Sequence, residues 1–186
     1  MTIIAAIKKD NKVLIGCDSF LGNSWVQTKI DNTKIVTFGN CAIGIAGNLS
    51  TRDVLEDLSR DPEWNHYWVV DKPSARYLAR EIFRRVKESF KDGLEHRADS
   101  DFIIATPNDI YKVQSDLSVY IVDKFEVIGA GMYQCMGSLN ALYDLVEDPK
   151  DILSKALNST CELNPFCTGP IHTYNLKYDQ PVEQTT

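Results

Sequence analysis

The sequence lacks the long apolar run that a membrane-spanning helix requires. None of its hydrophobic stretches approaches the roughly 18 residues of such a helix, so we expect no membrane partner. A basic excess is also missing, because 20 lysines and arginines face 26 aspartates and glutamates, which gives a net charge of −6. Nucleic-acid binders need a basic face, so we expect no nucleic-acid partner. The short apolar N-terminal stretch precedes its lysines, unlike a secretory signal.

Closely spaced cysteine pairs are absent as well. The five cysteines form no CxxC pair, and an odd number at irregular spacing is typical of reduced thiols in a cytoplasmic protein. Cys161, Cys167 and His172 match no common zinc spacing, so we interpret them as buried thiols and a strand histidine. No glycine motif for a dinucleotide or a phosphate is complete either. We therefore expect neither a metal nor a cofactor.

The composition that remains is that of an ordinary globular domain. The chain of 186 residues is 44% hydrophobic and 25% charged, which suits one domain with a sizeable core. We find no linker, repeat or low-complexity segment. The sequence therefore predicts a single domain over 1–186, with a polar C-terminal tail at about 178–186.

Blocks of predicted strands alternate with pairs of predicted helices. Antiparallel strand blocks between helix pairs predict an α+β protein, a four-layer αββα sandwich with two antiparallel sheets face to face between helix layers. Ser50 and Ser74 are candidate N-caps, and 61–71 is predicted as a loop. The strands are expected at 2–7, 13–17, 24–30, 34–38, 41–46, 102–106, 110–113, 119–122, 125–128 and 171–176, and the helices after Ser50 and at 74–92, 132–146 and 149–158.

The first strand of this pattern begins at residue 2. It places Thr2 at the edge of a sheet, although chain termini are usually loose. If Met1 is removed, the hydroxyl and the α-amino group of Thr2 lie on adjacent carbons. Such a pair is a nucleophile with its own general base. Alone, however, a threonine after Met is most often only the second residue of a chain.

Three further positions occur at ends of the predicted strands. Asp18 ends the second strand, Lys34 begins the fourth and Gly47 ends the fifth. Lys34 would lower the cost of forming an alkoxide, Asp18 would hold Lys34 in place, and the N–H of Gly47 would donate to an oxyanion. Each residue singly has a structural interpretation, as a turn residue or a solvated lysine. The case for acyl transfer rests on their order and spacing together.

These motifs resemble the N-terminal nucleophile hydrolases of the proteasome family, and above all HslV-type peptidases and proteasome β subunits. The resemblance implies the αββα fold, Thr2 as nucleophile, and polypeptide substrates in a homo-oligomeric ring that an ATP-dependent unfoldase could feed. Ser19, Ala130 and Gly131 would support the site. The matching segments are Thr2-Ile3-Ile4-Ala5, Gly16-Cys17-Asp18-Ser19, Lys34-Ile35, Gly44-Ile45-Ala46-Gly47 and Ile128-Gly129-Ala130-Gly131.

The chain also departs from the family pattern. Ala130 stands where the family usually has a serine, and 161–169 offers Glu162, Asn164 and Thr168 where it has an aspartate and a serine. Three functions therefore remain open. The first is a threonine endopeptidase in a self-assembled ring, the second a catalytically inactive structural or assembly subunit with this fold, and the third an amidase for a small substrate.

Overall fold

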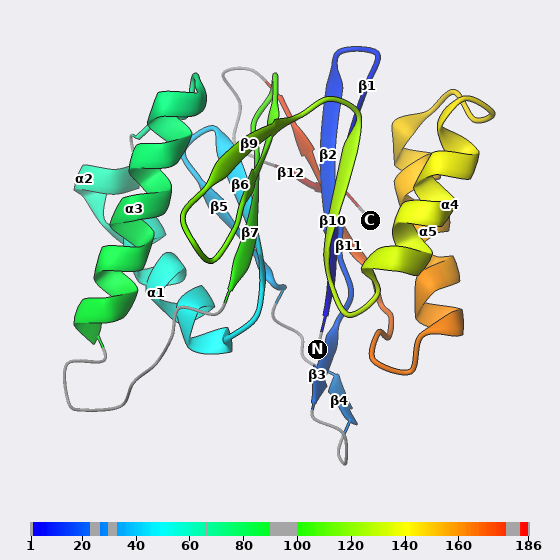
Figure 1. The fold of residues 1–186 in the computed structure, drawn as a ribbon, viewed down its shortest axis with the longest axis horizontal. Helices are drawn as coiled ribbons and strands as arrows, with labels where there is room; N and C mark the ends of the chain where they lie inside the picture. The colour runs from blue at the N-terminus through cyan, green and yellow to red at the C-terminus, as the bar shows by residue number, and fades with distance from the viewer. Residues whose placement is uncertain are drawn as a thin grey trace.

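Two antiparallel β-sheets lie face to face between two layers of helices (Figure 1). The computed structural model describes residues 2–22, 27–29, 33–65, 67–89, 100–177 and 183–185. The predicted four-layer αββα arrangement is confirmed. Within the described part of the chain, no helix is long and apolar enough to cross a membrane.

The N-terminal hairpin is at the centre of the first sheet. β1 (Ile3–Lys9) and β2 (Lys12–Cys17) join through Asp10 and Asn11, which have φ angles of 51° and 59°. Two positive φ angles are typical of a tight turn that suits the twist of a hairpin. The order in this sheet is β10-β1-β2-β11-β12. Its other strands are β10 (Phe125–Gly129), β11 (His172–Leu176) and β12 (Glu183–Thr185).

The second sheet is an antiparallel meander in the order β5-β6-β7-β8-β9. A separate small hairpin, β3 (Phe20–Gly22) with β4 (Gln27–Lys29), lies beside the N-terminus (Figure 1). The strands of the second sheet are β5 (Ile35–Phe38), β6 (Cys41–Ala46), β7 (Asp101–Ala105), β8 (Ile110–Val113) and β9 (Val119–Val122).

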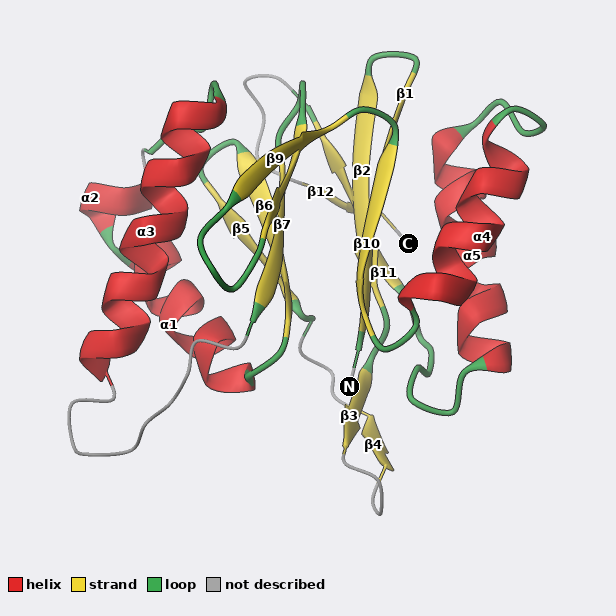
Figure 2. Ribbon diagram, in the orientation of Figure 1, coloured by secondary structure: helices red, strands yellow, loops and turns green. Residues whose placement is uncertain are grey.

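Each sheet is covered on its outer face by its own helices (Figure 2). Proline at the first helical position of α5 and the Asp148 cap, which accepts from Lys150 N–H, explain where that helix begins. α1, α2 and α3 cover the second sheet, and α4 and α5 cover the first. Their bounds are α1 (Leu49–Arg60), α2 (Pro62–Asn65), α3 (Lys72–Ser89), α4 (Met132–Tyr143) and α5 (Pro149–Leu163).

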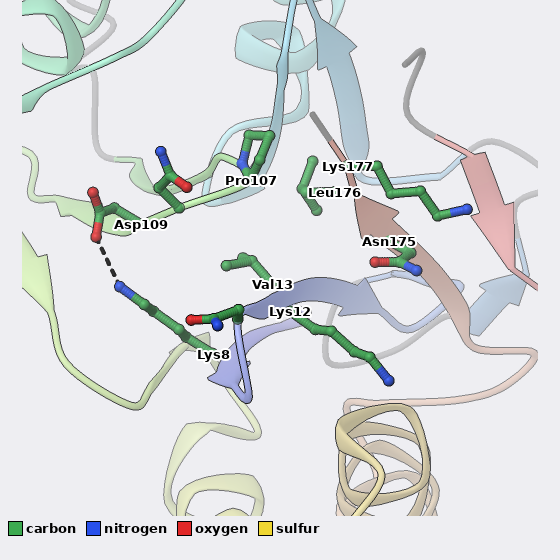
Figure 3. A pocket seen from close by; sticks show the side chains of 10 residues that line it. Lys8, Lys12, Val13, Pro107, Asp109, Asn175, Leu176 and Lys177 are labelled. Carbon is green, nitrogen blue, oxygen red and sulfur yellow. Dashed lines mark hydrogen bonds and ion pairs between the residues drawn. The ribbon is translucent and has the colours of Figure 1, made fainter. Parts of the chain in front are cut away.

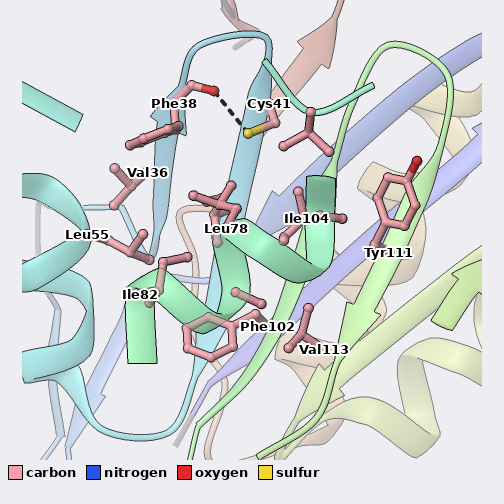
Figure 4. Close-up of a cluster of buried hydrophobic side chains, with 14 of the residues drawn as sticks. Val36, Phe38, Cys41, Leu55, Leu78, Ile82, Phe102, Ile104, Tyr111 and Val113 are labelled. Atoms are coloured by element: carbon pink, nitrogen blue, oxygen red, sulfur yellow. Dashed lines mark hydrogen bonds between the residues drawn. The ribbon is translucent and has the colours of Figure 1, made fainter. Parts of the chain in front are cut away.

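The four layers enclose three hydrophobic cores. One lies between the second sheet and its helices, where Leu78 and Ile82 of α3 meet Phe102 of β7 (Figure 4). Another lies between the sheets and a third beneath α4 and α5. β1 contributes to two of them, since Ile4 enters the inter-sheet core and Ile3 the core under α4 and α5. Because successive side chains of β1 point to opposite faces of the sheet, β1 packs against the layer on either side of it.

Several predicted element boundaries differ from the structure. The cap of α1 is Asn48 and not Ser50, because the Asn48 side chain accepts from Ser50 N–H. α3 begins at Lys72, with Asp71 accepting from Ser74 N–H, so Ser74 lies inside its first turn. The predicted loop at 61–71 contains α2.

The later helices and the tail differ too. α5 continues beyond the predicted end at 158 to Leu163, while α4 ends at Tyr143, three residues early. Residues 183–185 of the predicted polar tail form β12 against β11. The predicted strand 24–30 appears only as β4, and residues 23–26, 30 and 90–92 lie outside the described part of the chain.

The two sheets pack closely at Gly44 of β6. A Cβ added there would lie 2.4 Å from Ile4 Cγ2 and 3.2 Å from Ile15 Cδ1. Contacts below 3 Å are not tolerated, so any side chain at this position would push the sheets apart. The absence of a side chain at Gly44 therefore sets the distance between β6 and β1.

We expect Gly44→Ala to lower the free energy of unfolding by about 1–3 kcal/mol, because overpacking a filled core forces the backbone to move. The measurement is urea unfolding followed by circular dichroism. The matched control is Gly137→Ala in α4, where an added Cβ meets nothing within 4 Å. There, alanine should stabilise the helix by about 0.5–1 kcal/mol. Equal effects of the two substitutions would contradict this packing argument.

Candidate active site

Thr2, Asp18 and Lys34 meet at one end of the sandwich. Thr2 immediately precedes β1 and Asp18 follows β2, and the register that pairs Ile4 with Cys17 brings the two to one edge. Lys34 precedes β5 in the facing sheet. The site therefore forms where strand ends from both sheets converge, close to the N label in Figure 1.

The carboxylate of Asp18 is the centre of this site. Its Oδ1 accepts hydrogen bonds from Thr2 Oγ1 at 3.1 Å and Ile3 N at 3.0 Å, and from Lys34 Nζ at 2.5 Å. Its Oδ2 accepts from the backbone N–H groups of Phe20 at 3.1 Å and Thr168 at 3.3 Å. Five donors thus fix both oxygens of a side chain that is fully buried.

The ion pair between Asp18 and Lys34 is also buried. The Lys34 side chain is 3% exposed and that of Asp18 is 0% exposed. Removing two charges from water is costly, and only close pairing with further hydrogen bonds compensates that cost. The pair also places a cation at the oxygen to which the Thr2 hydroxyl donates. Thr2 is only 6% exposed. The arrangement can thus place a positive charge near the Thr2 hydroxyl where little water reaches it.

The loop after β10 holds the backbone of Thr2. Ala130 N–H donates to the Thr2 carbonyl oxygen at 2.7 Å. Gly129 has a φ of 97°, and a Cβ added there would lie 2.3 Å from the same oxygen, so only glycine allows this approach. Gly131 is similarly crowded, since its added Cβ would lie 2.9 Å from Cys167 Sγ. The Ile128–Gly131 segment therefore positions Thr2 through its backbone.

Asn164, the C-cap of α5, anchors that loop in turn. Its Nδ2 donates to the Ala130 carbonyl oxygen at 3.1 Å, while its Oδ1 accepts from Phe166 N–H at 2.9 Å. The side chain is buried, so its amide satisfies groups that water does not reach. Asn164 thus connects the end of α5 to the segment that holds Thr2.

Ser19 contacts the 168–172 segment. Its hydroxyl donates to the Pro170 carbonyl oxygen at 2.6 Å and lies 2.9 Å from His172 Nε2. Because a hydroxyl has one proton, which the carbonyl takes, His172 Nε2 must be the donor in the second bond. Ser19 N–H also donates to Thr168 O at 2.9 Å. Ser19 therefore positions the 168–170 segment, whose N–H group reaches Asp18.

Gly47 lies at the same end of the second sheet as Lys34. Ile45 N–H donates to the Lys34 carbonyl oxygen at 3.2 Å, and Gly47 follows two residues later. Gly47 is exposed and has a φ of 142°, a conformation that favours glycine. The strand pairing thus brings Gly47 to the edge of the sheet that carries Lys34.

The cysteines near the site are free thiols, of which Cys167 is buried and Cys161 half-buried. Burial raises the pKa of Cys167 to about 12 and that of Cys161 to about 11. Neutral thiols at ordinary pH are poor nucleophiles and poor metal ligands. Within the described ranges, no group of three or more histidine, cysteine or acidic residues could hold a metal.

Sequence reasoning missed the backbone donors to Asp18 from Ile3, Phe20 and Thr168. The backbone N–H group does not depend on the type of side chain, so no sequence motif could have indicated these donors. Asn164 and Thr168 stood out only as departures from a family pattern, without assigned contacts. The spacing of the apolar residues in α5, followed to the end of the helix, could have indicated Asn164 as its C-terminal cap.

Comparison with known proteins places this geometry in a known fold. No family model matches the sequence, and none of the curated proteins matches it. Among solved structures, Thiobacillus denitrificans BPH superposes with a TM-score of 0.82 at 18% identity, covering 95% of this chain and 100% of that chain. The same protein in complex with epoxomicin gives 0.84 at 17% identity, covering 96% and 100%.

A eukaryotic HslV from Trypanosoma brucei also superposes. Its TM-score is 0.69 at 16% identity, over 95% of this chain and 99% of that chain. This chain therefore has the αββα fold that the proteasome and HslV share. The predicted resemblance is confirmed at the level of the fold. Activity at such identity has to be argued from the residues of this chain.

We expect Lys34→Met to destabilise the protein by about 3–5 kcal/mol, because it leaves the Asp18 carboxylate buried without its cation. The free energy of unfolding in urea measures the effect. The control is Arg60→Gln, which removes a pair to Glu56 in which Arg60 is 69% exposed. Its loss should be below about 1 kcal/mol. A loss that small for Lys34→Met would show that the buried pair does not hold the site together.

Proposed function

We propose that this chain is a threonine peptidase of the proteasome family, with Thr2 as its nucleophile once Met1 has been removed. One observation carries the proposal: Thr2 Oγ1 and Lys34 Nζ both bond to Asp18 Oδ1 in a buried site. That cluster supplies a hydroxyl, a cation and a fixed anion in the arrangement that acyl transfer needs. The fold shared with HslV agrees with the proposal.

The reaction begins with proton transfer from the Thr2 hydroxyl. The acceptor is the α-amino group of Thr2, whose ordinary pKa of about 8 leaves part of it neutral near pH 7. Thr2 Oγ1 then attacks the scissile carbonyl carbon and forms a tetrahedral oxyanion. The leaving amine takes the proton as the C–N bond breaks, which leaves a threonyl ester. Water hydrolyses the ester and restores the hydroxyl.

The surrounding residues have distinct roles in this proposal. Lys34 stabilises negative charge on the Thr2 oxygen, and Asp18 holds Lys34 through the buried ion pair. The N–H of Gly47 is the proposed donor to the oxyanion. Ala130 supports the site through its N–H bond to the Thr2 carbonyl, and Gly131 through its close packing. Ser19 supports it indirectly, through the 168–170 segment.

We further propose that the active form is a homo-oligomeric ring in the cytoplasm that acts on polypeptides. A ring encloses an unselective nucleophile and limits it to chains that enter. An ATP-driven unfoldase is the proposed partner for folded substrates. A ring-sized particle in sedimentation would support this assembly, while a monomer or small dimer that hydrolyses amides would favour the small-substrate amidase.

We expect Thr2→Ala to abolish peptide hydrolysis and the covalent adduct with epoxomicin, the ligand of one structural neighbour. Thr2→Ser, which keeps a hydroxyl, should retain both in reduced measure. Fluorogenic peptide hydrolysis and intact mass spectrometry measure the two effects. The protein should first be shown to lack Met1 by mass. Processed wild-type protein that forms no adduct, while a control threonine peptidase does, would disprove the proposal.

A second candidate function is an inactive assembly subunit with this fold. Ala130 favours it, because this position carries a methyl group where the family usually has a serine hydroxyl. The intact mass of protein from its natural source separates the two functions. Loss of one methionine frees the amine of Thr2 and supports the peptidase, whereas retained Met1 in the assembled particle supports the assembly subunit.

Ala130→Ser tests the consequence of that difference. Ala130 is exposed, so a hydroxyl fits without repacking. In the peptidase we expect the added hydroxyl to orient the amine and raise kcat by about tenfold, since orientation of a catalytic group controls its rate. The control is Ala141→Ser on α4, which should leave kcat unchanged. No change from Ala130→Ser in an active enzyme would show that the amine is already positioned.

A further inference from the structure

The peptide bond that joins Thr33 to Lys34 is held from outside the candidate site. Lys34 directly precedes β5, so the orientation of this peptide determines where the lysine side chain starts. The Thr33 hydroxyl accepts from Ile35 N–H at 3.1 Å and lies 3.4 Å from Cys17 Sγ. These contacts fix the side chain of Thr33. The carbonyl oxygen of Thr33 belongs to the peptide itself, so the group that bonds it sets the orientation of that peptide.

Arg52 on α1 is the group that bonds this carbonyl. Its Nε donates to the Thr33 carbonyl oxygen at 2.6 Å. The Arg52 side chain is only 12% exposed, so water competes little for the same oxygen. Hydrogen bonds from a charged donor are shorter and stronger than those between neutral groups. Arg52 thus connects the helix layer to the peptide from which the Lys34 side chain extends.

Glu56 orients the guanidinium group of Arg52. Its Oε2 accepts from Arg52 Nη1 at 2.6 Å, one turn further along α1. Because the guanidinium is a rigid plane, a bond that fixes one of its nitrogens also fixes the direction of Nε. Glu56 Oε1 accepts from Arg60 at 2.5 Å as well, but the Arg60 side chain is 69% exposed. Glu56 therefore engages two arginines, of which Arg52 bonds the Thr33 carbonyl.

We propose that Arg52 is a positioning residue for Lys34. This inference rests on the proposed function, in which the Lys34 ammonium stabilises negative charge on the Thr2 oxygen. The ammonium is at the end of a flexible four-carbon chain, and its 2.5 Å bond to Asp18 Oδ1 leaves little room for displacement. Rotation of the Thr33–Lys34 peptide would move the start of that chain. Arg52 opposes this rotation and so acts on the reaction through Lys34.

Arg52→Gln removes the charged donor, and its effect can be measured on Lys34 itself. The rate at which acetic anhydride acetylates Lys34, followed by mass spectrometry, reports how often its amine leaves the ion pair. We expect acetylation about tenfold faster than in the wild type, the factor that corresponds to loss of one hydrogen bond from a charged donor. Arg52→Lys keeps a cation without the planar fork, so its rate should be intermediate.

Lys8 is the internal reference for this labelling. It lies near the other end of β1 and pairs with Asp109 at 2.9 Å (Figure 3). Because Asp109 lies between β7 and β8 of the second sheet, this pair reports on the contact between the sheets far from the candidate site. The acetylation rate of Lys8 should be the same in the wild type and in both Arg52 variants.

The kinetic consequence is measured with a fluorogenic peptide. Arg52→Gln should lower kcat by about tenfold and leave KM unchanged, because Lys34 stabilises charge that develops only after the substrate has bound. The matched control is Arg60→Gln, which removes the other partner of the same Glu56. It should change neither kcat nor the acetylation rate of Lys34.

Unchanged acetylation of Lys34 in Arg52→Gln overturns the proposal. Equal acceleration at Lys8 overturns it as well, because it would indicate loosening of the whole sandwich. In an active enzyme, an equal fall in kcat for Arg52→Gln and Arg60→Gln has the same consequence. If the processed wild type hydrolyses no peptide, the proposed function fails, and the acetylation of Lys34 alone decides whether Arg52 positions it.

Discussion

The buried ion pair between Asp18 and Lys34 is the interaction on which the candidate site depends. Lys34 comes from one sheet and Asp18 from the other, so the 2.5 Å contact exists only when the two sheets are correctly packed. An isolated charge in this place would be prohibitively costly. The ion pair therefore forms only in the folded sandwich, and the sandwich in turn has to supply the hydrogen bonds that stabilise the two buried charges. Chemistry and folding are coupled through one hydrogen-bonded carboxylate.

The geometry around that carboxylate follows from strand register. A shift of one residue in the β1–β2 hairpin would move Ile4 away from Cys17 and turn each side chain of β1 to the other face. The tight turn at Asp10 and Asn11 and the side-chain-free Gly44 both prevent such a shift. The position of the Thr2 hydroxyl is thus set by features at least eight residues away from it in the chain.

Much of this fold could be predicted because the strands are short, apolar and separated by clear turns. The strands at 41–46 and 110–113 have the bounds that the sequence predicts. The end of α5 was missed because its last turn contains polar residues, although Thr160 is buried and donates to Ala156 O. Boundaries of this kind depend on tertiary packing, which overrides local propensity.

In the candidate site, too, some residues could be predicted from the sequence and others could not. Thr2, Asp18 and Lys34 could be chosen from spacing and family resemblance, and the structure brings them together. The backbone donors to Asp18 could not be chosen, since a peptide N–H carries no side-chain signal.

The hydrogen-bonded setting of Thr2 also dictates how the protein should be produced. Thr2 is 6% exposed, its carbonyl is engaged by Ala130, and the next N–H is engaged by Asp18. An affinity tag fused ahead of Thr2 would keep the nitrogen of Thr2 as an amide, so the proposed general base would be absent. A recombinant protein meant for activity assays therefore needs its tag at the C-terminus, or a protease-cleavable leader that ends directly before Thr2.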